Sequence, residues 1–137
     1  MANKENEITV TVAEVVDYLK MSGRFASAVA EVIERVVTAE AAKKAGLKVS
    51  APLLQKAADA FRVANDLNKA SDTEDWLKSS GISLEAFEKY LETSLLVSSY
   101  KDHLEKKANK GKYLNSPAIK DTVREMIYKD WVRGQLK

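Results

Sequence analysis

The chain has 137 residues, of which 45% are hydrophobic and 31% are charged. Its 22 basic and 20 acidic residues give a net charge of +2, without the marked basic excess typical of nucleic-acid-binding proteins. Because it has no cysteine and one histidine, His103, the composition excludes disulfides, thiolate zinc sites and sites that need two imidazoles. Five glycines and two prolines favour long helices over a turn-rich β fold.

The ends and the hydropathy of the chain bear on its location. No stretch approaches the ~18 apolar residues that a membrane span needs, and the first residues lack the pattern of a signal peptide. We therefore expect a cytoplasmic protein without membrane contact, and a periplasmic or secreted one only if a leader has been removed. Residues 1–7 are expected to be flexible, and residues 8–137 to form a single helical domain.

The first two predicted helices follow from capping residues and apolar periodicity. Thr11, with Glu14 three residues later, predicts a capping box that opens a first helix ending near residues 21–23. A second, long helix is expected over residues 24–46, where apolar side chains recur at spacings of three and four. That stripe consists of Phe25, Val29, Val32, Ile33, Val36 and Val37.

Two more helices are indicated by start signals in the middle of the chain. Ser50 is the expected cap of a third helix, with Pro52 in the first turn, where its missing N–H is harmless. Ser71 and Glu74 predict a capping box for a short fourth helix that ends at a glycine. Both helices carry apolar residues at helical spacing.

The last two helices are separated by a short basic loop. Ser83 is expected to cap a fifth helix over about residues 84–108, and Pro117 opens a sixth. Residues 109–116 lie between them, and a loop of this length is ordinary for a helix–helix connection. The sequence therefore predicts an all-α fold of about six helices.

Two motifs in this order are typical of a known family. The first is a helix ending in A-x-x-x-G-[LI]-x-V-S, followed by a helix with Gln and Ala-Asp before Phe-Arg. It is formed by Ala42, Gly46, Leu47, Val49, Ser50, Gln55, Ala58, Asp59, Phe61 and Arg62. The second, W-L-x-x-x-G-[IL]-[ST]-x-E-x-[FL], is formed by Trp76, Leu77, Gly81, Ile82, Ser83, Glu85 and Phe87. Through their order and spacing, about residues 8–105 resemble the N-terminal chaperone domain of SurA-type peptidyl-prolyl isomerases.

The resemblance also implies a topology. In SurA-like proteins a parvulin domain follows the long helix, and a final helix then returns to the N-terminal helices. Residues 109–116 occupy the place of that insert, and the segment from Ser116, with Trp131 and Val132, resembles the returning helix. By this resemblance the chain keeps the chaperone part, lacks the isomerase part, and packs its C-terminal helix back on the N-terminal helices.

The function implied by the resemblance is non-enzymatic binding of a polypeptide client in an apolar groove, without cofactor or metal. The parvulin domain and its histidines are missing. One alternative is a homodimeric or adaptor protein, with an exchanged sixth helix, that serves peptide maturation or secretion. A third, weak nucleic-acid binding, is least favoured because charge is balanced. It would use Lys101, Lys106, Lys107, Lys110 and Lys112.

Aromatic residues are the candidates for a peptide site. Phe25, Phe61, Trp76, Phe87, Tyr90 and Trp131 are most simply core residues. A peptide-binding domain must leave part of such a surface open, and apolar anchors would give it affinity. The candidate peptide-binding residues are Trp76, Tyr90, Tyr100, Tyr113 and Trp131. No catalytic or metal-binding residue is expected, because Asp72, Glu74 and Asp75 fit first-turn acids and His103 fits an exposed or partly packed helical residue.

Overall fold

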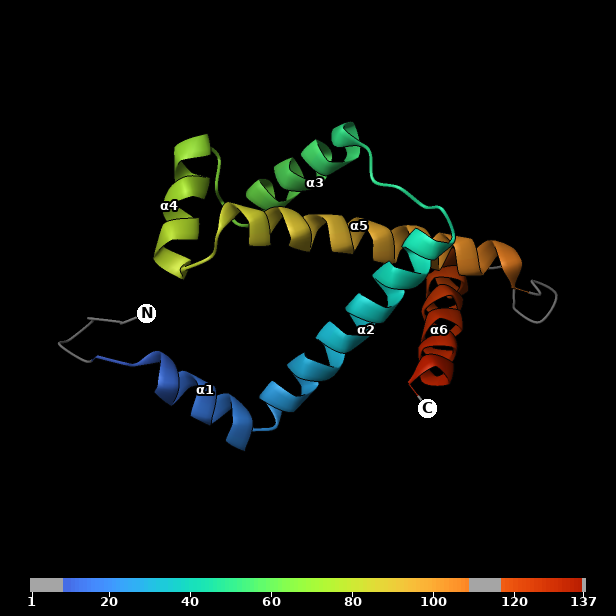
Figure 1. Ribbon diagram of the computed structural model, residues 1–137, viewed down its shortest axis with the longest axis horizontal. Helices are drawn as coiled ribbons and strands as arrows, with labels where there is room; N and C mark the ends of the chain where they lie inside the picture. The colour runs from blue at the N-terminus through green and yellow to red at the C-terminus, as the bar shows by residue number, and fades with distance from the viewer. Residues whose placement is uncertain (1–8, 109–116, 137) are drawn as a thin grey trace.

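The computed structural model describes residues 9–108 and 117–136, with side chains described from residue 120 onward in the second range. These residues form six helices and no strand (Figure 1), which confirms the predicted all-α fold. The helices are α1 (Val12–Met21), α2 (Arg24–Lys44), α3 (Ala51–Ala64), α4 (Ala70–Ser80), α5 (Leu84–Lys107) and α6 (Pro117–Gln135). Within the described ranges, no helix has the length and apolar character needed to cross a membrane.

Three helices have the N-terminal cap that the sequence predicts. The Thr11 hydroxyl accepts a hydrogen bond from Glu14 N at 3.1 Å, and Thr11 N donates to Glu14 Oε1 at 3.4 Å. Ser50 and Ser83 each accept from the backbone N–H three residues later, at 3.3 Å and 3.0 Å. These bonds satisfy backbone donors that have no partner in the first turn of a helix.

The predicted capping box of α4 is wrong. The helix is preceded by Lys69, whose backbone is extended, and Lys69 N donates to Asp72 Oδ2 at 3.0 Å. Ser71 and Glu74 therefore lie inside the helix rather than at its start. Since the Asp72 carboxylate reaches back three residues, α4 begins earlier than a serine cap would allow.

Helix α5 is the organising element of the fold. It runs through the middle of the molecule, with α3 and α4 near its first half, α2 crossing it near its middle and α6 near its second half (Figure 1). Apart from Leu67, the buried apolar residues form three clusters along it: Ala39, Ala42 and Leu96; Leu77, Phe87 and Leu91; Val97, Tyr128 and Val132. Every cluster contains an α5 residue, so α5 joins α2, α3, α4 and α6 into one core.

The C-terminal helix packs back on the N-terminal part of the chain, as predicted. Tyr128 is 2% exposed, and its hydroxyl lies 3.0 Å from the hydroxyl of Thr38 on α2. Lys129 Nζ binds Glu34 Oε1 at 2.8 Å. These contacts join segments about ninety residues apart, so α6 closes the core formed by α2 and α5.

The first part of the chain forms an arm, defined as residues 12–36, that extends away from the rest of the molecule (Figure 1). Helix α1 has no buried residue, and all residues from 20 to 33 are exposed. The bonds that join α2 to α5 and α6 begin at Glu34 and Arg35, so the first half of α2 lacks their cover. Phe25, predicted to be a core residue, is 38% exposed, and that prediction is wrong.

Candidate functional site

The predicted peptide-binding residues fall into two separate groups. Trp76 and Tyr90 lie together near the start of α5, whereas Tyr100 and Trp131 meet where α6 crosses the other half of α5. Tyr113 lies outside the described residues. The structure therefore separates a single predicted set into two sites with different neighbours.

The first group lines a surface cavity of about 390 Å³, here called the aromatic pocket. Its walls come from α3, α4, α5 and the turn between α4 and α5. They consist of Phe61, Trp76, Ile82, Ala86, Phe87 and Tyr90. None of these side chains is charged, and a pocket of this volume and composition is typical of sites for apolar ligands.

Phe61 holds the aromatic rings of the pocket together. Its ring centroid lies 5.4 Å from Trp76, 5.0 Å from Phe87 and 6.4 Å from Tyr90, in edge-to-face arrangements. Such arrangements place the positive edge of one ring against the negative face of another. Phe87 is buried, Trp76 is half-buried and Tyr90 is 52% exposed. The pocket thus has a fixed floor and an open aromatic rim.

The turn between α4 and α5 positions the rim residue Ile82. Gly81 has φ of 70°, a left-handed conformation that favours glycine, and it ends α4. Ile82 N donates to Leu77 O at 2.9 Å, and Ser83 then caps α5. The run Gly-Ile-Ser therefore reverses the chain and presents Ile82 at the edge of the pocket.

Arg35 of α2 fixes the orientation of Tyr90. The guanidinium lies 4.8 Å from the centroid of the Tyr90 ring, and Arg35 Nη2 donates to Tyr90 O at 3.2 Å and to Ser94 Oγ at 3.0 Å. A cation over the face of an aromatic ring is attracted by the ring quadrupole. Tyr90 is consequently held in place while half of its surface stays accessible.

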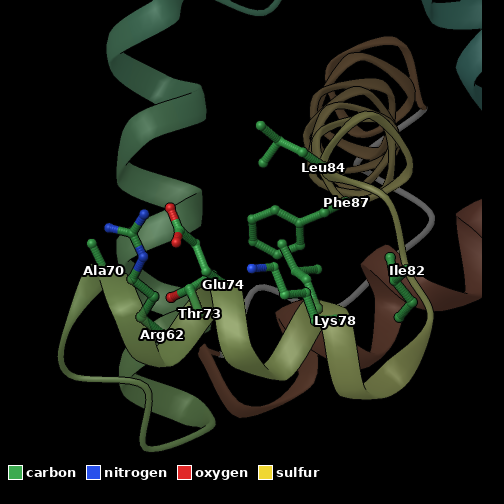
Figure 2. Close-up of a pocket in the computed structure, with 9 residues that line it drawn as sticks. Arg62, Ala70, Thr73, Glu74, Lys78, Ile82, Leu84 and Phe87 are labelled. Carbon is green, nitrogen blue, oxygen red and sulfur yellow. The ribbon is translucent and has the colours of Figure 1, made fainter.

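A second cavity of about 330 Å³ adjoins the aromatic pocket and shares Ile82 and Phe87 with it. Figure 2 shows Arg62, Thr73 and Glu74 gathered on one side of this cavity, with the Phe87 ring facing them. It is therefore polar at one end and apolar at the end shared with the aromatic pocket.

Two polar atoms of this second cavity have no partner. Thr73 is 5% exposed, and neither its Oγ1 nor Arg62 Nε makes a hydrogen bond to another described residue. Arg62 Nη1 binds Asp59 Oδ1 at 3.2 Å, so part of the guanidinium is paired. Buried polar atoms are normally satisfied, and water or a ligand group is the usual partner where protein supplies none.

The second group of predicted residues serves to hold α6. The Tyr100 ring lies 5.0 Å from the Trp131 ring and stacks at 5.3 Å on His103. Trp131 also stacks on Tyr128, with centroids 6.4 Å apart, and both Tyr100 and Trp131 are half-buried. Packing of α6 on α5 accounts for these contacts, and neither Tyr100 nor Trp131 lines the aromatic pocket.

The predicted lysine cluster is partly engaged within the fold. Lys101 Nζ binds Glu125 Oε1 at 2.8 Å and lies 4.6 Å from the centroid of the Tyr128 ring. Lys106 and Lys107 are exposed at the end of α5, and residues 110 and 112 lie outside the described residues. Lys101 is thus committed to the contact between α5 and α6.

The acidic residues of α4 are arranged as helix residues rather than as a metal site. Asp72 accepts the Lys69 N–H at the start of the helix, and the side chains of Glu74 and Asp75 are exposed. In the part of the chain that the structure describes, no three His, Asp or Glu side chains are grouped to hold a metal ion.

Several residues of the site were missed by sequence reasoning. Phe61 and Phe87 are predicted to be core residues; Phe87 is buried, Phe61 is half-buried against the same cluster, and both rings form the floor of the pocket. Ile82 was not selected, although its place directly after the helix-ending Gly81 could have indicated a rim position. Nothing in the sequence pattern pointed to Arg62 and Thr73 as neighbours.

The chain matches no model of a known protein family, no curated protein and no solved structure. The resemblance to SurA-type chaperone domains therefore stays a prediction.

Proposed function

We propose that this chain is a non-catalytic, chaperone-like domain that binds polypeptides, and that the aromatic pocket takes an apolar or aromatic side chain of an unfolded or extended segment. The observation that carries the proposal is an uncharged cavity of about 390 Å³ with an exposed aromatic rim. A hollow lined by aromatic and aliphatic side chains is the usual form of an anchor site for a peptide.

The lining of the aromatic pocket favours binding over chemistry. Apart from the Tyr90 hydroxyl, its side chains offer no acid, base or nucleophile. General acid–base catalysis requires a positioned group of suitable pKa within reach of a substrate atom, and an uncharged wall does not supply one. The pocket instead offers apolar area and ring edges.

The expected affinity is low and suits reversible holding. Burying one large apolar side chain contributes about 1.5–3 kcal/mol, and ring-to-ring contacts add about 0.5–1.5 kcal/mol. These contributions sum to about 2–4.5 kcal/mol, and association also costs translational and rotational freedom, so a single anchor would bind with a dissociation constant of about 1 mM or weaker. A client with a second apolar segment would bind more tightly.

The second cavity supplies polar groups to the part of the client that extends beyond the aromatic pocket. Its residues Arg62, Thr73, Glu74 and Lys78 lie next to the shared wall at Phe87. Main-chain carbonyl and N–H groups of a bound segment need partners of this kind, because leaving them unpaired costs free energy. The SurA-like pattern of the sequence points to the same class of client, a polypeptide.

Two other hypotheses receive less support. Nucleic-acid binding through the lysine cluster is disfavoured by the pairing of Lys101 with Glu125. Exchange of α6 between chains would form the same bonds of Tyr128 with Thr38 and of Lys129 with Glu34 between two copies, so these bonds give it no support over packing within one chain. An adaptor role in peptide maturation or secretion stays a prediction.

The proposal is tested by fluorescence with single-tryptophan variants. Trp131→Phe leaves Trp76 as the one tryptophan of the chain, and Trp76 lines the aromatic pocket. Titration with an unstructured peptide that carries Phe and Leu should shift its emission saturably, with a dissociation constant of about 1 mM or weaker. The same peptide with Ser in place of Phe and Leu should give no shift.

Matched controls locate the response. Trp76→Phe leaves Trp131, which lies between α5 and α6, and its emission should not change. Ile82→Asp places a carboxylate on the rim and should weaken binding about ten-fold or more, because the charge must be desolvated. Leu53→Asp alters an exposed leucine outside the pocket and should have no effect. Equal responses to both peptides, or equal losses in both Asp variants, would contradict the proposal.

A further inference from the structure

The arm carries a large apolar surface that the chain itself does not cover. Nine of its apolar side chains are between 38% and 81% exposed: Val12, Val15, Tyr18, Met21, Phe25, Val29, Val32, Ile33 and Val36. Their spacing on α2 places Phe25, Val29, Val32 and Val36 on one face of the helix. This surface is distinct from the aromatic pocket, which no arm residue lines.

The extent of this surface is that of a protein interface. The largest apolar patch on a typical monomer measures about 300–600 Å². The nine side chains together expose an area on the order of the ~800 Å² that each partner buries in a standard interface. From Phe25 to Val36 the face runs about 16 Å along the helix, enough for three turns to pack against another helix.

The charges at the two ends of this face are opposite. At the tip of the arm, Lys20 Nζ lies 5.3 Å from the Phe25 ring centroid, so its charge sits at the end of the apolar face. At the other end, Glu40 lies one turn beyond Val36 on the same face, and it is exposed and makes no ion pair with a described residue. Lys43, which lies on the same face beyond Glu40, is paired with Glu92 of α5 at 3.9 Å. The unpaired charge is therefore basic at the tip of the face and acidic at its base, at Glu40.

We propose that the occupant of this face is a second copy of the chain, with the two arms packed antiparallel about a two-fold axis between Val29 and Val32. This arrangement sets Phe25 opposite Val36 of the second copy and brings each Lys20 near the other copy's Glu40. A parallel arrangement would place like charges together. Because a two-fold interface must be self-complementary, a face with opposite charges at its ends fits an antiparallel dimer.

Sedimentation velocity of the full chain over a wide concentration range tests the proposal. The wild-type chain should show a monomer–dimer equilibrium. Val32→Glu, at a position 57% exposed in the single chain, should weaken dimerisation at least about 100-fold, because two-fold symmetry buries two unpaired carboxylates. Val63→Glu, at a position on α3 that is 75% exposed, should leave the equilibrium unchanged. Far-ultraviolet circular dichroism should be the same for all three chains.

A charge exchange tests the antiparallel arrangement. Lys20→Glu and Glu40→Lys should each weaken dimerisation roughly five-fold, since each change breaks two symmetry-related ion pairs at the edge of the interface. The double variant should return to within about two-fold of wild type, because each pair is restored with its signs reversed.

Three outcomes overturn the proposal. One is a wild-type chain that stays monomeric at every concentration, which would leave the arm to polypeptide clients. A second is a dimer that persists in Val32→Glu, as exchange of α6 would produce. The third is an equal loss in Val63→Glu, which would show that any added charge disrupts association.

Discussion

The arm and the rest of the chain, here called the body, share the same helical periodicity of apolar residues but differ in their tertiary contacts. Both carry apolar residues at spacings of three and four along α2, yet Val36 is 55% exposed while Ala39, three residues later, is 9% exposed. The change coincides with the point where α5 and α6 begin to contact α2. Periodicity therefore specifies a helix and its apolar face, and tertiary contact decides whether that face is buried.

The difference should also appear in stability. Most of the stability of a helix in a protein comes from tertiary packing of its apolar face, and short helices are marginal on their own. The body has three buried clusters that all include α5, whereas α1 has no buried residue. We therefore expect the body to unfold as one cooperative unit and the arm to open locally at a lower free energy.

The largest difference in the free energy of unfolding is expected between two Phe→Ala changes, one in the body and one in the arm. Phe87→Ala should lower the free energy of unfolding by about 3–5 kcal/mol, because Phe87 is 6% exposed and contacts Phe61 and the buried cluster. Phe25→Ala in the arm should cost less than about 1 kcal/mol, since much of that ring already faces solvent.

Urea denaturation measures both changes. The protein concentration should be as low as detection allows, because self-association through the arm would raise the apparent stability. Equal costs for Phe87→Ala and Phe25→Ala would show that the arm is as well packed as the body, and the comparison would then fail.

A second prediction concerns how the body holds α6. Arg124 on α6 pairs with Asp102 and with Glu105, and its Nη2 donates to Ser98 O at 3.1 Å. Because the guanidinium is partly buried and has several partners, Arg124→Ala should cost about 1–2 kcal/mol of stability. Arg133→Ala removes an exposed pair with Asp130 on the same helix and should cost less than about 0.5 kcal/mol.

Thermal unfolding followed by Trp131 emission compares the two arginine variants. Trp131 lies at the contact of α5 and α6, so it reports loosening of α6 directly. If Arg133→Ala lowers the melting temperature as much as Arg124→Ala, the bonds across helices add nothing to those within α6.

The boundaries of the helices were largely predictable because caps are local. Thr11 and Ser83 each bond to a backbone N–H three residues later, so the signal and its effect lie in one turn. The start of α4 is also set locally, but by another residue pair. The Asp72 side chain accepts from Lys69 N, so the helix begins before the predicted capping box of Ser71 and Glu74. The exposure of Phe25 could not be predicted, because it depends on where α5 and α6 stop.

The site was predictable only in part. Tyr90 and Tyr100 both lie off the main apolar stripe of α5, and nothing in their spacing shows that they have different neighbours. The two residues lie about 15 Å apart along the helix, which puts Tyr90 beside α2 and α3 and Tyr100 beside α6. The pocket depends on the long-range contact of Phe61 with Trp76 and Phe87, which no periodicity encodes.

A third prediction uses the pH dependence of the bond that joins α2 to α6. Burial raises the pKa of Tyr128 above its ordinary value of 10.0, and the charge of Glu34 acts in the same direction. Tyr128→Phe should cost about 0.5–1.5 kcal/mol near neutral pH, where the phenol is hydrogen-bonded to Thr38.

The sign follows from proton binding. Above about pH 10 the unfolded chain loses the Tyr128 proton while the folded chain keeps it, so the stability of the wild type falls as pH rises. Tyr128→Phe lacks this loss, and the stability gap between the two chains should shrink between about pH 9 and pH 11. A gap that stays constant or widens would contradict the raised pKa.

The smallest expected change in global stability comes from removing the cap of the arm. Ser83→Ala removes the cap of α5 and should lower the free energy of unfolding by about 1 kcal/mol, because α5 belongs to every buried cluster. Thr11→Ala removes an equivalent cap from α1 and should change global stability by less than about 0.3 kcal/mol.

The effect of Thr11→Ala should appear in hydrogen exchange instead. Amide exchange in α1 should speed up about five-fold, while amides of α5 keep their rates, because the lost bond stabilises only a locally opening helix. In Ser83→Ala the exchange of the slowest amides of the body should accelerate together. If Thr11→Ala destabilised the whole chain as much as Ser83→Ala, the arm would be folding with the body, and its apolar face would have to be covered.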